Sequence, residues 1–127
     1  NLEQELLKSQ MVWRRVSIQQ ALSLQAALRG RISETWLTFV GTDPESVVFR
    51  EDLNGALMAA GIKTKFYSGW ERAVGLGVSG GTAQERKLML EAFHSAGLPL
   101  VEFPEIEFAK GQLQILVGTK PPPTFQK

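Results

Sequence analysis

The residues Ser79-Gly80-Gly81-Thr82 have the composition of a turn that binds an anion. Unpaired backbone N–H groups and the helix dipole both favour a phosphate where a glycine-rich turn leads into a helix, and a helix is expected to begin at Thr82. Lys120 could neutralise such a phosphate if the last strand runs nearby. The pattern is therefore compatible with phosphate binding by Gly80, Gly81, Thr82 and Lys120, as in a nucleotide-binding or phosphate-binding sensor or enzyme.

The same turn has a second interpretation that needs no ligand. It lacks the G-x-x-x-x-G-K-[ST] loop of nucleotide hydrolases and the G-x-G-x-x-G loop of dinucleotide-binding proteins. Thr82 and Glu85 form a T-x-x-E capping box. Glycines inside a strand, such as Gly75 and Gly77, more often permit close packing than ligand approach. Helix capping and phosphate binding both stay open at this turn.

Four carboxylates around the expected start of another helix form a second candidate cluster. Asp43 and Glu45 lie at the helix start, and Glu51 and Asp52 follow in the same helix. Paired carboxylates can transfer protons or hold Mg²⁺. Acidic residues are also favoured at helix N-termini by capping and by the helix dipole, which accounts for Asp43 and Glu45 without any ligand.

The composition excludes several kinds of active site. The chain has no cysteine and one histidine, His94. Thiolate nucleophiles, zinc-thiolate sites, disulfides and clusters of imidazole ligands are therefore excluded. A Ser-His-Asp triad would need His94, which lies in the last turn of its expected helix, where a cation is favoured for structural reasons. We expect no metal and no cofactor, and we favour a non-catalytic role, although an enzyme stays open.

Length and charge bound the number of domains and the kinds of partner. A chain of 127 residues with 43% hydrophobic residues suits one compact domain with an appendage. The net charge of +1 gives no general attraction for nucleic acid. A membrane span needs about 18 consecutive apolar residues, and no such stretch is present.

Aromatic residues alternate with cations in the segment KTKFYSGWER. Strand alternation predicts that Phe66 lies in the core and that Tyr67 and Trp70 are exposed near a turn. Exposed aromatic residues among cations can form a protein interface or stack on single-stranded nucleic acid. The nearly neutral chain favours protein contact, so Tyr67 and Trp70 are predicted interface residues.

The first residues predict helices that could meet a partner. Leu2, Leu6, Trp13 and Val16 lie close to a heptad seam, and we expect this seam to form the interface of a homodimer, with packing on the chain's own domain as the alternative. We assign residues 1–30 to an N-terminal helical stalk, residues 31–120 to an α/β domain and residues 121–127 to a proline-rich tail.

Three helices have clear start and stop signals. The first is expected over residues 18–29, after a Ser17-x-x-Gln20 capping box and before Gly30. Ile18, Ala21, Leu22 and Leu28 are expected to share one apolar face of this helix. The second helix begins with Asp43 as N-cap and Pro44 at its first position, and ends at Gly61. The third runs from Thr82 to Gly97.

Two segments of the chain share one pattern. Residues 36–66 and 73–103 each predict a strand, a small-residue turn, a capped helix and a second strand. A parallel return needs a crossover of about a dozen residues, which the short link between the two segments does not provide, so a hairpin is expected there. The predicted fold is a ferredoxin-like α/β (α+β) two-layer sandwich of order β-α-β-β-α-β, with LQILVG as an added edge strand. A parallel Rossmann-like sheet is the alternative.

Several short motifs resemble those of poorly characterised bacterial and phage membrane-anchored proteins. They are Arg15-x-Ser17-x-x-Gln20, Asp43-x-Glu45 and Val117-Gly118-x-Lys120-Pro121. In those proteins, transmembrane helices and a helical stalk precede a small cytoplasmic α/β domain. The resemblance implies a cytoplasmic module tethered to an inner membrane by a segment outside this chain, and it carries no catalytic residues.

Together these features predict a non-catalytic interaction or regulatory domain. We expect it to associate with itself, or with a protein partner, through Leu2, Leu6, Trp13 and Val16, and to belong to a larger membrane-anchored protein. Nucleic-acid binding by the segment from Lys63 to Arg72 is a further alternative. It would show affinity that falls with salt.

Overall fold

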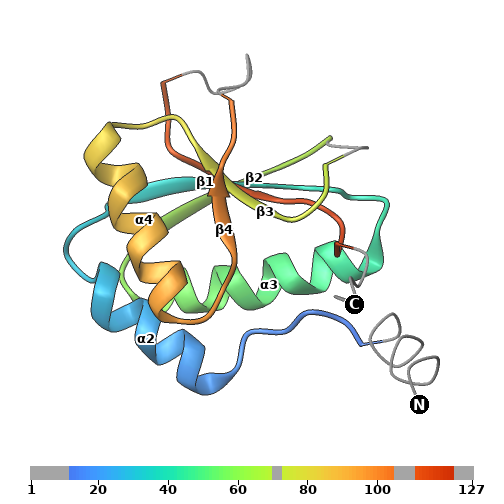
Figure 1. Cartoon of the computed structure of the whole chain (residues 1–127), viewed down its shortest axis with the longest axis horizontal. Coiled ribbons are helices and arrows are strands. Elements are labelled where there is room, and N and C mark those ends of the chain that lie inside the picture. Colours follow the sequence, from blue (N-terminus) through green and yellow to red (C-terminus); the bar gives the residue numbers. More distant parts are fainter. Residues whose placement is uncertain (1–11, 70–72, 105–110, 122–127) are drawn as a thin grey trace, which may run out of the picture.

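Three helices cover one side of a five-stranded sheet in the computed structural model, which describes residues 12–69, 73–104 and 111–121 (Figure 1). The mixed α/β class expected from the sequence is confirmed. The helices are α2 (Ile18–Leu28), α3 (Pro44–Ala59) and α4 (Ala83–Ser95). The strands are β1 (Glu34–Phe39), β2 (Lys63–Ser68), β3 (Leu76–Ser79), β4 (Leu100–Glu102) and β5 (Gln114–Val117).

Reciprocal capping boxes begin α2 and α4, as the sequence predicts. At α2, the Gln20 N–H donates to the Ser17 hydroxyl at 3.1 Å, and the Ser17 N–H donates to the Gln20 amide oxygen at 2.9 Å. At α4, Thr82 and Glu85 exchange the same two bonds. Each box satisfies two N–H groups that the first helical turn leaves without partners.

Helix α3 begins at the expected residues, but its N-cap residue, Asp43, does not cap it. Pro44 occupies the start of the helix and Asp43 the N-cap position, but the Asp43 side chain makes no capping hydrogen bond. It instead accepts from the Ser46 hydroxyl at 2.7 Å. The helix ends as predicted, because Gly61 follows the C-cap with a φ of 85° that favours glycine.

Each of the two repeated segments forms a strand-helix-strand unit with adjacent parallel strands. Strand β1 pairs with β2 around α3, and β3 pairs with β4 around α4. Strand β5 joins the units, since it pairs in parallel with β1 and antiparallel with β3. The repeat seen in the sequence is therefore confirmed as two local units.

The ferredoxin-like arrangement of these units is wrong. The strand order is β2-β1-β5-β3-β4, so β2 and β3 form no hairpin and β5 lies in the centre of the sheet, not at an edge. Because β3 is antiparallel to the strands before it, β3 begins at the end of the sheet where β2 ends. The end of β2 and the start of β3 are therefore only three strand spacings apart, about 14 Å, and seven residues can reach about 25 Å when extended.

The core lies between the sheet and the helices, and α2 is part of it. Leu24 and Leu28 of α2 are fully buried, and α2 packs against both α3 and α4. The residues expected to share one apolar face of α2 differ in burial: Leu28 is fully buried, whereas Ile18 and Leu22 are 82% and 57% exposed. Phe66 was also expected in the core, but it lies on edge strand β2 and is 44% exposed.

Candidate functional site

Several polar groups of the glycine turn at the end of β3 are hydrogen-bonded within the chain. The Thr82 N–H donates to the Glu85 carboxylate at 2.9 Å, and the Glu85 N–H donates to the Thr82 hydroxyl at 3.0 Å. The Arg86 guanidinium donates to the carbonyls of Gly80 and Gly81. A carboxylate thus already lies at the start of α4, where a phosphate was considered.

Tight packing explains Gly80. Its φ is 71°, and a Cβ atom there would lie 1.9 Å from the Gln112 carbonyl oxygen. Lys120 lies at the opposite end of the sheet from this turn, because β3 pairs Ser79 with Gln114 and Leu76 with Val117. The structure therefore places Gly80, Gly81 and Thr82 together and Lys120 apart from them.

The predicted interface residues fall on two surfaces. Trp13, near the beginning of the described chain, is 46% exposed, and Tyr67 on β2 is 39% exposed. Val16 is partly buried and packs against the core of its own chain. Leu2, Leu6 and Trp70 lie outside the described residues.

The first turn of α3 holds the N-terminal segment through a buried ion pair. Glu45 accepts from the Arg14 backbone N–H at 2.8 Å, from Arg14 Nε at 2.9 Å and from Arg14 Nη2 at 2.7 Å. The side chains of Arg14 and Glu45 are 16% and 7% exposed. The guanidinium also lies 4.5 Å above the centre of the Phe49 ring. Bidentate geometry and low exposure make this a strong contact.

A second carboxylate, two turns further along α3, repeats the arrangement. Asp52 accepts from Arg15 Nε at 2.7 Å, from Arg15 Nη2 at 3.1 Å and from the Val16 N–H at 3.0 Å. The hydrogen bond from Arg15 lowers the pKa of Asp52 and raises the pKa of Arg15. Glu45 and Asp52 together fix residues 14–16 along α3.

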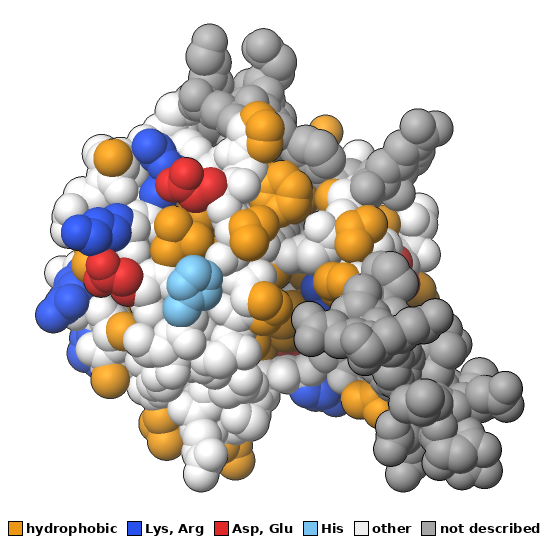
Figure 2. Space-filling model, viewed as in Figure 1, with side chains coloured by type: hydrophobic (Ala, Val, Ile, Leu, Met, Phe, Trp, Pro, Cys, Tyr) orange, Lys and Arg blue, Asp and Glu red, His pale blue; other side chains and the backbone are white. Residues whose placement is uncertain are grey.

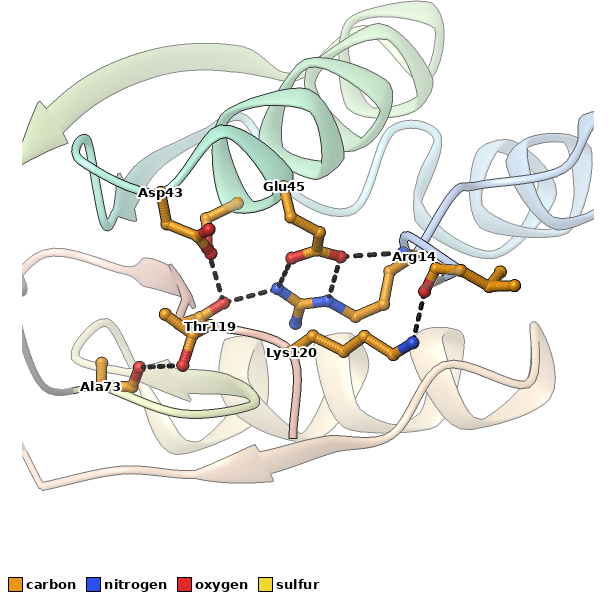
Figure 3. A network of polar contacts seen from close by, with 9 residues as sticks. Arg14, Asp43, Glu45, Ala73, Thr119 and Lys120 are labelled. Atoms are coloured by element: carbon orange, nitrogen blue, oxygen red, sulfur yellow. Dashed lines mark hydrogen bonds and ion pairs between the residues drawn. The ribbon is translucent and has the colours of Figure 1, made fainter. Parts of the chain in front are cut away.

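The end of β5 joins the same contact (Figure 3). The Gly118 carbonyl accepts from Arg14 Nη2 at 2.6 Å and from the Ser46 hydroxyl at 3.1 Å. Lys120 donates to the Val12 carbonyl, and the Thr119 hydroxyl donates to the Ala73 carbonyl at 3.2 Å. Four segments far apart in the sequence therefore meet here: residues 12–14, the start of α3, Ala73 and residues 118–120. Asp43, Glu45, Gly118 and Lys120, which belong to two of the short motifs described in the sequence, lie in these segments.

A cavity of about 500 Å³ lies beside this junction. Its wall is mostly apolar and includes Phe49 from α3, Leu76 from β3, and Leu98 and Val101 around the start of β4. Arg14, Arg15 and Lys120 supply its charged groups. Figure 2 shows hydrophobic side chains gathered over β4, with a hollow beside them. The site is thus an apolar recess with a cationic border.

The described ranges contain neither a metal-binding cluster nor a membrane span. No group of three or more His, Cys, Asp or Glu side chains in them could hold a metal ion. No helix in them has the length and hydrophobicity needed to cross a bilayer. Glu45 and Asp52 are engaged by arginines, as described above.

Comparison with known proteins adds no assignment. No protein-family model, curated protein or solved structure matches the chain. The class is therefore that of a mixed α/β domain with the strand order given above.

Sequence reasoning treated Glu45 as a helix-start residue and missed its partner, Arg14. A usable signal was present: the Arg14-Arg15 pair is matched by Glu45 and Asp52, which stand seven residues apart and so share one face of a helix. The cavity had no such signal, because its apolar residues come from separate elements that only the sheet order brings together.

We expect Glu45→Gln to destabilise the fold by about 2 kcal/mol, because Arg14 would keep its charge in a largely buried position without a carboxylate. Urea unfolding measures the change. The control is Glu91→Gln on α4, whose side chain is 64% exposed and, among the described residues, pairs only with the exposed Lys87; it should change stability by less than about 0.5 kcal/mol. Equal losses in the two variants would contradict the structural role of Glu45.

We expect Gly80→Ala to cost at least about 2 kcal/mol more than Gly61→Ala, because overpacking adds to backbone strain. Both glycines have positive φ, but a Cβ at Gly61 would meet nothing within 4 Å. The difference between the free energies of unfolding of the two variants measures the cost of the clash between a Cβ at position 80 and the Gln112 carbonyl. Similar values for both would show that the glycine turn has room for a side chain.

Proposed function

We propose that this chain is a non-catalytic module that associates with a second copy of itself through α2. The supporting observation is an apolar row on the outer side of this helix: Ile18, Leu22 and Ala26 follow one another at intervals of four residues and are all exposed. Hydrophobic side chains are exposed along the lower border of the molecule, where Figure 1 places α2 (Figure 2). Residues spaced in this way form one stripe that a second helix can cover.

The absence of charge on α2 favours a second copy over a different partner. The helix sequence IQQALSLQAAL contains no acidic or basic residue. In a two-fold symmetric dimer the same patch meets itself, so a charge near its centre would approach an identical charge. An uncharged helix with an apolar row avoids this repulsion, and the small Ala26 allows two helices to approach closely.

Other exposed apolar residues are proposed as further contacts. Val12 and Trp13 precede α2 and are 60% and 46% exposed. Tyr67 lies on the edge strand β2 and is proposed as a secondary contact. Leu2, Leu6 and Trp70 keep the role proposed for them from the sequence, and Val16 would act by orienting the segment through its own core contacts.

By its resemblance to membrane-anchored proteins, we propose that the module is the cytoplasmic part of a larger protein. Tethering two copies in one membrane raises their effective concentration, so a modest interface would suffice for association.

We expect Leu22→Glu to raise the dissociation constant of the homodimer at least about 100-fold, since it places two carboxylates in the apolar row and removes an anchor worth about 2.7 kcal/mol. Light scattering or analytical ultracentrifugation over a concentration series measures this.

Gln19→Glu is the matched control, because Gln19 is an exposed residue of the same helix outside the row. It adds the same charge and should leave the dimer nearly unchanged. An unmodified chain that is monomeric at its highest attainable concentration would refute the proposal, as would equal effects of the two substitutions.

A further inference from the structure

We propose that the cavity beside the Arg14–Glu45 pair binds an amphiphilic carboxylate, a small molecule with an apolar body and one acidic head. This inference is independent of self-association, because it uses other residues. It rests on the shape and lining of the cavity and on the donors at its border.

The cavity suits an apolar body. Its volume of about 500 Å³ falls within the range of about 300–1,000 Å³ that is usual for small-molecule sites. Phe49, Leu76 and Leu98 line it and are nearly fully buried, whereas Val74 and Val101 line it and are 49% and 55% exposed. A buried floor and an exposed apolar border leave hydrophobic surface that a ligand can remove from water.

The charged groups of the lining favour an anion. Among the described residues, the lining includes Arg14, Arg15 and Lys120 but no acidic side chain. Glu45 and Asp52 pair with the two arginines from positions outside the lining. A ligand in the cavity would therefore face cations, with their carboxylate partners behind them.

Arg14 has hydrogen-bond donors for the acidic head. A guanidinium carries five N–H donors. Nε and Nη2 donate to Glu45 and Gly118, whereas Nη1 has no acceptor among the residues that the structure describes. Figure 3 shows this third nitrogen directed away from Glu45 and toward Lys120. A carboxylate beside it would gain charge-assisted hydrogen bonds.

The loop at the border is held in place without a ligand. The Gly75 N–H donates to the Thr119 carbonyl at 2.8 Å, and the Gly118 N–H donates to the Gly75 carbonyl at 2.8 Å. These bonds, with the contacts of Arg14, keep both walls of the cavity at fixed positions. A preformed site loses less conformational entropy on binding than a site that must be ordered by its ligand.

The first test uses the unmodified chain and the probe 1-anilinonaphthalene-8-sulfonate, an aromatic anion whose fluorescence rises in apolar sites. We expect saturable binding and displacement by octanoate at concentrations about tenfold lower than by 1-octanol. That ratio corresponds to one charge-assisted hydrogen bond of roughly 1.5 kcal/mol. Equal displacement by acid and alcohol, or no displacement by octanoate, would overturn the proposal.

The second test locates the site with two variants that add the same charge at similarly exposed valine and methionine positions. Val101→Glu, at the border of the cavity, should weaken octanoate binding at least about tenfold, because like charges repel at close range. Met58→Glu on α3 lies outside the lining, is 59% exposed in the native chain, and should leave binding unchanged. Near-ultraviolet circular dichroism confirms that both variants are folded. Equal effects of the two substitutions would place the probe elsewhere and overturn the proposal.

The third test concerns the acidic head. Lys120→Gln should weaken octanoate about threefold or more while leaving octanol unchanged, because it removes a cation near the head and no apolar surface of comparable size. Lys87→Gln, on the exposed face of α4, is the control and should alter neither ligand. A loss of octanol affinity equal to that of octanoate would contradict a role for the border cations.

Discussion

The ion pair between Arg14 and Glu45 is the contact on which the arrangement of the termini depends. It joins the segment before α2, the first turn of α3 and, through the Gly118 carbonyl, the end of the central strand β5. These segments are separated by 31 and 104 residues from Arg14. A buried ion pair is strong when further hydrogen bonds support it. Here the Arg14 backbone N–H also donates to Glu45, the Gly118 carbonyl accepts from the guanidinium, and the Phe49 ring lies against it.

The same contact links the fold to both proposed surfaces. Because Glu45 and Asp52 hold residues 14–16 along α3, the chain enters α2 with Leu24 and Leu28 toward the core. The opposite side of α2 then presents Ile18 and Leu22 to solvent. Arg14 also forms part of the wall of the apolar cavity. A single polar junction thus orients the helix proposed for self-association and borders the recess proposed for a ligand.

Local signals in the sequence predicted local structure well. The capping boxes at Ser17 and Thr82 and the two strand-helix-strand units are all present, since each depends on residues near one another in the chain. The predicted sheet order was wrong because the length of the link between β2 and β3 limits how far apart these strands can lie, but does not specify which strands are neighbours. The sequence did not indicate which side of α2 is buried, because its Ala and Leu residues give apolar side chains on more than one face. The cavity and the role of Arg14 depend on long-range contacts, which a periodic pattern does not encode.

The most direct measurement of the Arg14–Glu45 junction is amide hydrogen exchange, followed residue by residue by nuclear magnetic resonance. The N–H groups of Arg14 and Val16 lie outside any helix or strand, and they donate to the Glu45 and Asp52 carboxylates of α3. If these carboxylates fix the segment, both amides will exchange far more slowly than unstructured peptide. Protection at Arg14 will be lost in the Glu45→Ala variant, which has no side-chain acceptor, while Leu53 in α3 stays protected. Exchange of both amides at the unstructured rate in the unmodified chain would show that the segment is not held, and would contradict the central role of this ion pair.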